Sequence, residues 1–282
     1  MGILNQGHSL KNVHEVVLAD DCSPDRTEAV AKEIWKASTP PLRTFRNSKN
    51  TKEYINVNTC VASLPENVEW FLHMHGDNVP LPNWLESFQK ACLKADNKVG
   101  MVCASYEVFE GNKTLNVGDK RGGQERIIGG DESVRGTILK GCWWHTSCTA
   151  IRKKTFLEVG GFPPGMRQKG DWDYLLRFLS SGSDIIYLQK PLMRYRMHEA
   201  SASSFALGAN LDIEESLQIV LKFAGIMRAH EILLYHYRTA VTLLRRNLSA
   251  IIKINPKKAY SSALYQIRNC ANCISCLIVK FK

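Results

Sequence analysis

Short apolar runs alternate with amphipathic segments along the first two thirds of the chain. Runs of strand length occupy residues 15–19, 42–46, 70–75, 99–104, 149–152 and 184–188. Between them, apolar residues recur at helical spacing over 23–35, 54–64, 83–92, 155–159 and 172–179. This alternation predicts an α/β fold with a mostly parallel central sheet.

Two regions depart from the alternation. From Ser105 to Lys140 the sequence is polar and rich in glycine, which predicts a long irregular binding loop or lid. Beyond Asn210 the apolar residues return at helical spacing only. We therefore expect a principal domain over residues 1–205 and a helical C-terminal region over 206–282.

The charge of the chain is concentrated at its C-terminal end. The stretch 222–282 contains eleven Lys or Arg residues and one acid, Glu231, so it accounts for the whole net charge of +10. A basic tail indicates an anionic partner, either a membrane leaflet or a polyanion, although a solvated helical face explains it equally well. Nucleic acid is disfavoured, because the basic residues are not interleaved with exposed aromatics or glycines.

Composition bears on localisation as well. No run approaches the roughly 18 apolar residues of a membrane span, and nothing at the start of the sequence resembles a signal peptide. We expect a cytoplasmic protein that associates peripherally with the inner face of a membrane through its basic tail.

Two of the predicted strands end on acidic residues. The first runs into Asp20-Asp21, and the second runs through His75 into Asp77. Ligands of open α/β sheets bind beyond the carboxyl ends of the strands, so these acids predict a crevice that holds a divalent metal. His75 alternates with Asp77 and is either a second metal ligand or a residue that packs at the strand end. Asp21 has an alternative role as a cap for the following helix.

Five further patterns occur in one order along the chain. They are Val17–Asp25, His75-Gly76-Asp77-Asn78 with Pro82-x-Trp84-Leu85, Gly160-Gly161-Phe162, Gly170-Asp171-Trp172-Asp173 with Leu176-Arg177, and Tyr195-Arg196-x-His198 with Ser201 and Ser203. Together they resemble family 2 glycosyltransferases of the GT-A fold, over roughly residues 3–204. The resemblance implies a GT-A domain, Rossmann-like in its sheet, followed by a helical appendage.

The resemblance also implies an activity. It predicts an inverting, metal-dependent transferase that moves a sugar from a nucleotide-diphosphate sugar, with UDP favoured, to a saccharide or lipid-linked acceptor. The cofactor would be Mg or Mn, because the departing diphosphate accumulates negative charge.

Each predicted site residue takes its role from that family. Asp77 matches the second acid of the Asp-x-Asp motif and would bind the metal, with His75 in place of the first acid and His198 as a further ligand. Asp20, Asp21, Asn58, Asp77 and Arg196 would contact the donor. Asp171 would be the general base, whereas Asp173 would only stabilise the start of its helix.

Three departures from the family pattern point to an alternative. No apolar strand precedes the first helix, and the family places that strand at the centre of its sheet, so we expect a gap in the sheet and weakened donor binding. His75 and Asn78 stand where acids are common. The alternative is therefore a catalytically inactive GT-A module that binds partners or membranes.

Trp143 and Trp144 are either a stacking floor for an acceptor sugar or core residues.

Overall fold

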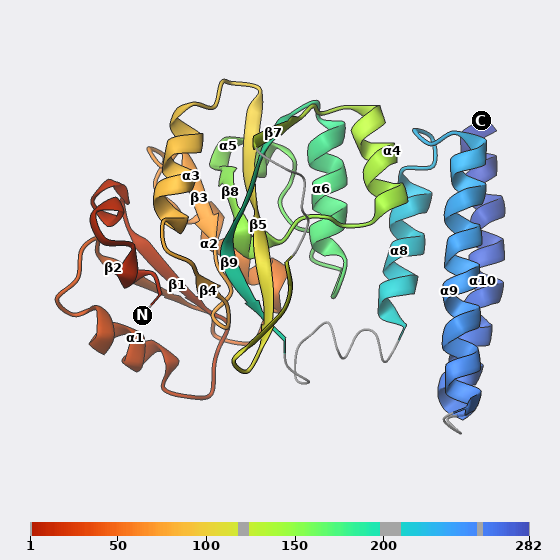
Figure 1. The fold of residues 1–282 in the computed structure, drawn as a ribbon, viewed down its shortest axis with the longest axis horizontal. Helices are drawn as coiled ribbons and strands as arrows, with labels where there is room; N and C mark the ends of the chain where they lie inside the picture. Colours follow the sequence, from red (N-terminus) through yellow and green to blue (C-terminus); the bar gives the residue numbers. More distant parts are fainter. Residues whose placement is uncertain (1, 118–123, 198–209, 253–255, 282) are drawn as a thin grey trace.

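The structure, a computed structural model, describes residues 2–117, 124–197, 210–252 and 256–281. The strands are β1 Val16–Asp20, β2 Leu42–Arg46, β3 Trp70–His73, β4 Val79–Pro80, β5 Val99–Glu110, β6 Lys113–Val117, β7 Gln124–Ile127, β8 Thr149–Arg152 and β9 Asp184–Arg196. The helices of the first domain are η1 Leu4–Asn12, α1 Thr27–Trp35, α2 Glu53–Ala62, α3 Trp84–Leu93, α4 Asp131–Lys140, η2 Thr146–Cys148, α5 Lys153–Glu158 and α6 Gly170–Ser180. Figure 1 shows their arrangement.

Every strand and helix predicted from the apolar pattern is present, although several ends differ. Helix α1 begins at Thr27 rather than Ser23, because the Ser23 N–H is bonded to Asp20 in the turn that follows β1. Strands β5 and β9 run well past their predicted ends. The predicted residues His198, Ser201 and Ser203 and the boundary at 205 lie outside the described residues.

The strands form two sheets. Strands β1 and β2 pair in parallel on their own, and the other seven form a sheet of order β3-β8-β5-β9-β4, with β6 on β5 and β7 on β9. In the larger sheet only β5 and β9 are parallel, so the sheet is mixed and the prediction of a mostly parallel sheet was wrong. Strands β4, β6, β7 and β8 all pair antiparallel with their neighbours, and the apolar pattern within a strand does not indicate the direction of its partner.

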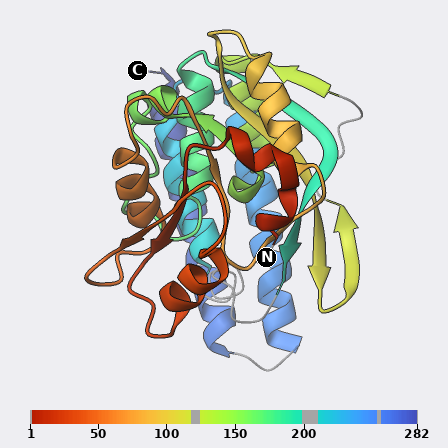
Figure 2. The same ribbon diagram turned by 90° about the vertical axis from the view of Figure 1, so that its left-hand side faces the viewer.

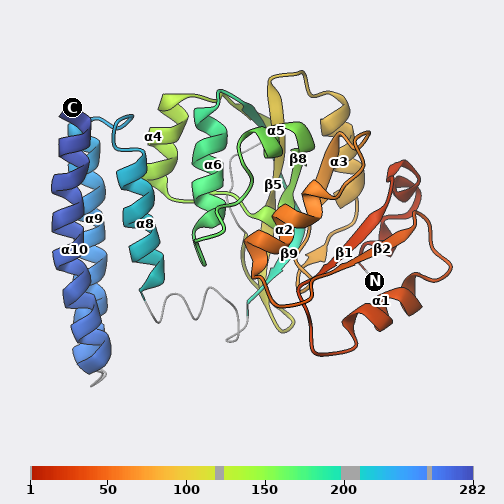
Figure 3. The same ribbon diagram turned by 180° about the vertical axis from the view of Figure 1, so that it is seen from behind.

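The gap predicted in the sheet corresponds to a break between the two sheets that the described strands form. Among the described strands, β1 pairs only with β2, and the outer strand β3 pairs only with β8. Helix α2 joins β2 to β3 and lies against β1 (Figure 3). Its Asn56 side chain donates a hydrogen bond to the Ala19 carbonyl of β1 at 3.0 Å. Contacts with this helix therefore help to attach the small sheet to the rest of the domain.

The prediction of an irregular loop from Ser105 to Lys140 was wrong. Strand β5 continues to Glu110 and forms a ribbon with β6 (Figure 2), and Asp131–Lys140 is helix α4. The sequence of this region is polar although it forms regular structure. The side chains of β6 are mostly exposed, and α4 buries only a narrow face around Val134 and Ile138. The glycine pair 122–123 lies outside the described residues.

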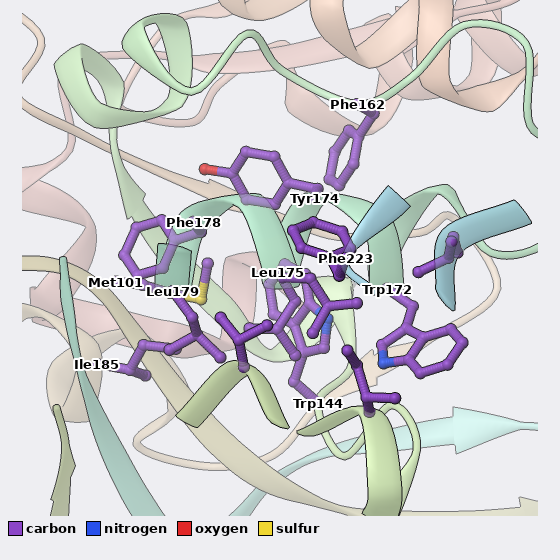
Figure 4. Packing of buried hydrophobic residues seen from close by; sticks show 14 of the residues in the cluster. Met101, Trp144, Phe162, Trp172, Tyr174, Leu175, Phe178, Leu179, Ile185 and Phe223 are labelled. Carbon is purple, nitrogen blue, oxygen red and sulfur yellow. The ribbon is translucent and has the colours of Figure 1, made fainter. Parts of the chain in front are cut away.

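The core lies on both faces of the larger sheet. Met101 and Cys103 of β5 pack on the side of α6, whereas Val102 and Ala104 pack on the side of α3, as expected for alternate residues of a strand. Helix α6 is buried on most of its surface. Figure 4 shows Trp172, Tyr174, Leu175, Phe178 and Leu179 of this helix among the core side chains. The sheet thus has helices on both faces, and its strand ends remain at the edges of these layers.

The C-terminal region is helical, as predicted. It contains α8 Leu211–Lys222, α9 Ala229–Ile252 and α10 Pro256–Phe281, with α9 and α10 packed side by side (Figure 1). Helix α8 contributes Ile219 and Val220 to the main core. No helix within the described ranges combines the length and the apolar character that a membrane span requires.

Candidate active site

The two acids at the end of β1 are bonded to neighbouring protein groups. Asp21 accepts hydrogen bonds from the Asn47 side chain (2.8 Å), the Thr51 N–H and hydroxyl (2.8 Å each) and the Lys52 N–H (2.7 Å). Asp20 is buried and pairs with Arg46. Burial acts to raise the pKa of Asp21, but its hydrogen bonds outweigh burial and hold the pKa below the ordinary value. Both acids therefore order the loops around β1, and their contact with a nucleotide stays a prediction.

An ion pair connects α2 to the end of β3. Glu53 is the first residue of α2, and its Oε1 lies 2.8 Å from Nε2 of His75. Burial lowers the pKa of His75, but the hydrogen bond and charge of Glu53 raise it above the ordinary value. The pKa of Glu53 falls to about 2, because the bond and charge of His75 outweigh the effect of burial. The pair therefore favours the protonated form of His75 and the ionised form of Glu53.

Two further histidines pack beside this pair. The His73 ring lies 4.8 Å from the His75 ring, and the His145 ring lies 5.6 Å from it, measured between centroids. Burial lowers the pKa of both His73 and His145 to about 3, and the charge of His75 adds to the effect. Both are neutral at physiological pH, and His75 is the histidine of this cluster whose protonated form its surroundings favour. The His145 ring also contacts Tyr195 of β9 at 4.7 Å.

Asp77 and Arg196 lie together on the other side of His75. Asp77 is exposed on the turn after β3. The Arg196 Nε donates to the Asp77 carbonyl at 3.1 Å, and the Arg196 N–H donates to the Asn78 side chain at 3.2 Å. The negative charge of Asp77 helps to raise the pKa of His75. The end of β9 is thus fixed against the turn that bears Asp77.

Asp171 lies at the start of α6, close to the same residues. The Tyr54 hydroxyl accepts a hydrogen bond from the Asp171 N–H at 3.3 Å, which ties α6 to the second residue of α2. The Asp171 carboxylate accepts the Trp172 N–H at 2.8 Å. Burial raises the pKa of Asp171 to about 6, and the charges of Glu53 and His75 also act on it. The structure therefore brings Asp171, His75, Asp77 and Arg196 to one edge of the domain.

Asp173, two residues further on, has a different environment. Its carboxylate is fully buried and lies 2.6 Å from Nε of Arg177 and 2.8 Å from Nζ of Lys222. These contacts join α6 to α8 and are consistent with the structural role assigned to Asp173 from the sequence.

Other residues singled out from the sequence are used in packing. The Asn58 side chain donates to the Phe162 carbonyl (2.7 Å) and accepts from the Phe162 N–H (2.8 Å), so it braces α2 against the loop before α6. Its contact with the donor stays a prediction that this geometry does not favour. Trp144 is buried and stacks on Tyr174, and the Trp143 indole donates to Thr137 at 3.0 Å. These contacts favour the core interpretation of both tryptophans over a sugar-stacking floor.

Sequence reasoning missed three residues of the site. The helix predicted over residues 54–64 excludes Glu53, and the sequence patterns assign no role in the site to His145 or Tyr106. Tyr106 of β5 contacts the His145 ring at 5.3 Å and the Tyr195 ring at 6.3 Å. The position of Glu53 at the first turn of a helix that leads into β3 was the available signal, because such a turn lies near the edge where ligands bind. Tyr106 lies near Tyr195 through the long-range pairing of β5 with β9, and His145 lies beside both because η2, which it precedes, contacts these two strands.

The donor groups at this edge bear on the predicted metal. Among the described residues, no group of three or more His, Cys, Asp or Glu side chains is arranged to hold a metal ion. The Nε2 atom of His75 is bonded to Glu53, and this bond favours the protonated ring, which has no nitrogen lone pair to offer a metal; the pairing therefore weighs against the predicted role of His75 as a ligand. Asp77 alone fits the usual mode of Mg²⁺, which combines one or two carboxylates with phosphate oxygens of the substrate. The third predicted ligand, His198, lies outside the described residues.

Solved structures with a similar fold are glycosyltransferases. The S. aureus TarS 1-349 structure in complex with UDP-GlcNAc matches with a TM-score of 0.58 and 12% identity, covering 95% of this chain and 83% of that one. The mannosyltransferase PcManGT from Pyrobaculum calidifontis, in complex with GDP-Man and Mn²⁺, matches with a TM-score of 0.53 and 14% identity, covering 99% and 81%. GalNAc-T7 with UDP, GalNAc and Mn²⁺ gives 0.52 and 14%, covering 74% and 42%. These matches confirm the predicted GT-A fold.

The sequence was also compared with family profiles and with curated proteins. The profile of the family "Glycosyl transferase family 2" matches residues 2–167, which is more than half of the chain. A comparison with curated protein sequences gave no significant match.

Proposed function

Because the chain belongs to glycosyl transferase family 2, we propose that it transfers a sugar from a nucleotide-diphosphate sugar to a hydroxyl group of a saccharide or lipid-linked acceptor. Transfer would proceed with inversion at the anomeric carbon, and a UDP-sugar is the first donor to test. The observation that supports this proposal is the convergence of Asp171, Asp77 and Arg196 around the Glu53–His75 pair.

Asp171 is the proposed general base. A carboxylate with a pKa of about 6 is largely ionised at neutral pH, yet it is more basic than an ordinary aspartate. It would take the proton of the acceptor hydroxyl while that oxygen forms a bond to the anomeric carbon. The bond from the anomeric carbon to the diphosphate breaks at the same time, and its electron pair leaves with the nucleoside diphosphate. The proton on Asp171 then passes to water.

The departing diphosphate needs positive charge, and this edge offers two sources. A Mg²⁺ or Mn²⁺ ion would neutralise the diphosphate directly, and Asp77 is the residue that would hold it together with the phosphate oxygens. Arg196 is a cation of the protein itself, and the pairing with Glu53 favours the protonated form of His75. Because His75 stands where the family has an acid, it would add positive charge near the diphosphate instead of helping to hold the metal ion.

One observation favours the alternative of a catalytically inactive binding module. Asp21 accepts four hydrogen bonds from the loop before α2, so its carboxylate has little capacity left for a nucleotide. The small sheet that carries it is separated from the larger one. If these features abolish donor binding, the chain would act only through its surfaces.

Release of nucleoside diphosphate from UDP-, GDP- and dTDP-sugars, with Mn²⁺ or with EDTA, separates these possibilities. We expect release from at least one donor by the parent chain, and retained donor binding without release by Asp171→Asn. Asp131→Asn, an exposed acid at the start of α4, is the matched control and should behave like the parent.

The remaining outcomes assign the source of positive charge. Release that EDTA and Asp77→Ala both abolish indicates the cation, whereas release that survives EDTA but is lost in Arg196→Ala indicates the protein cations. Undiminished release by Asp171→Asn would remove this residue from the mechanism. A chain that neither binds nor cleaves any donor would support the inactive module.

A further inference from the structure

The exposed hydrophobic side chains of this protein are concentrated on two helices. Twelve of the twenty large hydrophobic side chains that the described residues expose belong to α9 and α10. On α9 the series is Leu233, Leu234, Tyr237, Leu244 and Leu248. On α10 it is Tyr260, Leu264, Ile267, Ile274, Ile278 and Phe281, and Val279 is the remaining residue of the twelve. Spacings of three and four residues place each series on one side of its helix, and we call these two series the outer stripes.

The opposite sides of both helices hold the region together. His236 of α9 lies 2.7 Å from the Asn269 side chain of α10, and both are buried. Tyr265 of α10 donates to Glu214 of α8 at 2.8 Å. In Figures 1 and 3 the pair of helices forms the end of the molecule farthest from β1 and β2, with α8 between the pair and the sheet. The outer stripes therefore face away from α8 and from the rest of the protein.

Such an arrangement differs from the scattered apolar residues of an ordinary surface. Single exposed leucines need no explanation, whereas contiguous apolar surface on a monomer marks a site of interaction. Helix α9 has 24 residues and α10 has 26, so the stripes extend along helices roughly 36 to 39 Å long. Tyr237, Ile267 and Phe281 are 67%, 69% and 76% exposed, which leaves most of each side chain available to a partner.

The charges around the outer stripes indicate which partner fits. Helices α9 and α10 contain seven Lys or Arg residues and one acid, Glu231. Glu231 is buried and faces Arg135 of α4 at 3.6 Å. Arg245 is exposed at one margin of the α9 stripe, and so is Arg238, whose guanidinium also donates a hydrogen bond to the Leu139 carbonyl of α4 at 3.1 Å. The described part of these two helices therefore presents no exposed carboxylate beside the stripes.

A second copy of the chain and a lipid surface differ in how they meet this charge. A twofold dimer through the stripes would bring the same basic margins together without compensating acids. An anionic bilayer accepts leucine, isoleucine and aromatic side chains at its interface and supplies phosphates for the flanking arginines. We propose that the outer stripes of α9 and α10 dock the protein on an anionic phospholipid surface. This docking does not depend on the proposed sugar transfer.

Co-sedimentation of the full chain with vesicles tests the proposal. The vesicles contain either phosphatidylcholine alone or an equal mixture with phosphatidylglycerol. We expect binding to the mixed vesicles that weakens at high salt and is much poorer on phosphatidylcholine. The double variant Leu244→Gln/Ile274→Gln should bind the mixed vesicles about tenfold less tightly, which corresponds to about 1.4 kcal/mol.

Controls separate docking from damage to the fold. Leu157→Gln replaces a comparably exposed leucine on α5 and should bind like the parent. Arg245→Gln should weaken binding to the mixed vesicles and leave binding to phosphatidylcholine unchanged. Far-UV circular dichroism checks that each variant is folded.

Two results would overturn the proposal. One is equal binding of the parent and the double variant to the mixed vesicles. The other is a parent dimer in light scattering that the double variant converts to a monomer, with no vesicle binding by either, which would assign the stripes to self-association. The assay contains no nucleotide sugar, so its result is independent of the transferase assays.

Discussion

Replacing the proposed general base should make the protein more stable. In the native state burial raises the pKa of Asp171 from 3.8 to about 6. Each unit of pKa corresponds to about 1.4 kcal/mol between protonation states, so ionising Asp171 reduces the free energy of unfolding by about 3 kcal/mol at most. Asp171→Asn removes that cost, because a neutral amide cannot ionise and its oxygen can still accept the Trp172 N–H.

The sign and pH window of this effect follow from the direction of the shift. Between the unfolded pKa of 3.8 and the folded pKa of about 6, the native state binds more protons than the unfolded state. Stability therefore falls as pH rises through this window and is constant, as far as Asp171 is concerned, above it. The advantage of Asp171→Asn should grow by about 2 kcal/mol between about pH 4.5 and about pH 8.

Urea unfolding of the parent, Asp171→Asn and Asp131→Asn at several pH values measures this difference. The rate of donor cleavage by the parent should rise over the same window and level off above it, because the ionised form is the base. If Asp171→Asn is no more stable than the parent at about pH 8, or if its advantage is independent of pH, then Asp171 is not the desolvated carboxylate that the mechanism requires.

Three further substitutions test separate parts of the site. Glu53→Gln should lower the pKa of His75 toward its ordinary value, because the carboxylate that favours the protonated ring is lost. A proton NMR titration of the imidazole measures the change. An unaltered pKa would contradict the pairing of Glu53 with His75. Asn58→Ala should lower the free energy of unfolding by about 2 kcal/mol, because the Phe162 backbone groups lose their partners. Calorimetry should show an unchanged affinity for the donor. A reduced affinity in a fully folded variant would support the predicted contact between Asn58 and the donor. Asp173→Asn should lower the free energy of unfolding, measured in urea, by about 3 kcal/mol, because Arg177 and Lys222 lose a fully buried partner. An unchanged free energy of unfolding would show that this carboxylate is not needed for packing.

Much of the fold was accessible from the sequence because its signals are local. Apolar runs and helical spacing identified β5, β8, α3 and α6, each of which contributes buried residues to the core. The region of β6 and α4 was misread for the same reason: β6 is exposed and α4 buries few residues, so local pattern carried little information there. Strand direction was misjudged in the larger sheet, since pairing partners are set by contacts that are distant in sequence.

The candidate site likewise has features that local motifs predicted and features that depend on residues distant in the sequence. Asp77, Asp171 and Arg196 were identified from short motifs, and the structure brings them to one edge. The charge state of His75 could not be predicted, because it depends on Glu53, which lies 22 residues earlier in the chain. Motifs indicate which residues take part, whereas their protonation depends on neighbours that only the fold supplies.

Helix α2 explains how the site is assembled although the sheet is divided. Its first residue pairs with His75, its second receives the Asp171 N–H, and Asn56 bonds the Ala19 carbonyl of β1. One helix thus contacts the small sheet, the end of β3 and the start of α6. Because strand pairing does not join the two sheets, the geometry of the donor-side loops depends on how firmly α2 is held. A ligand that spans both sheets would therefore stabilise the protein through α2, since any ligand bound only by the native state raises the free energy of unfolding.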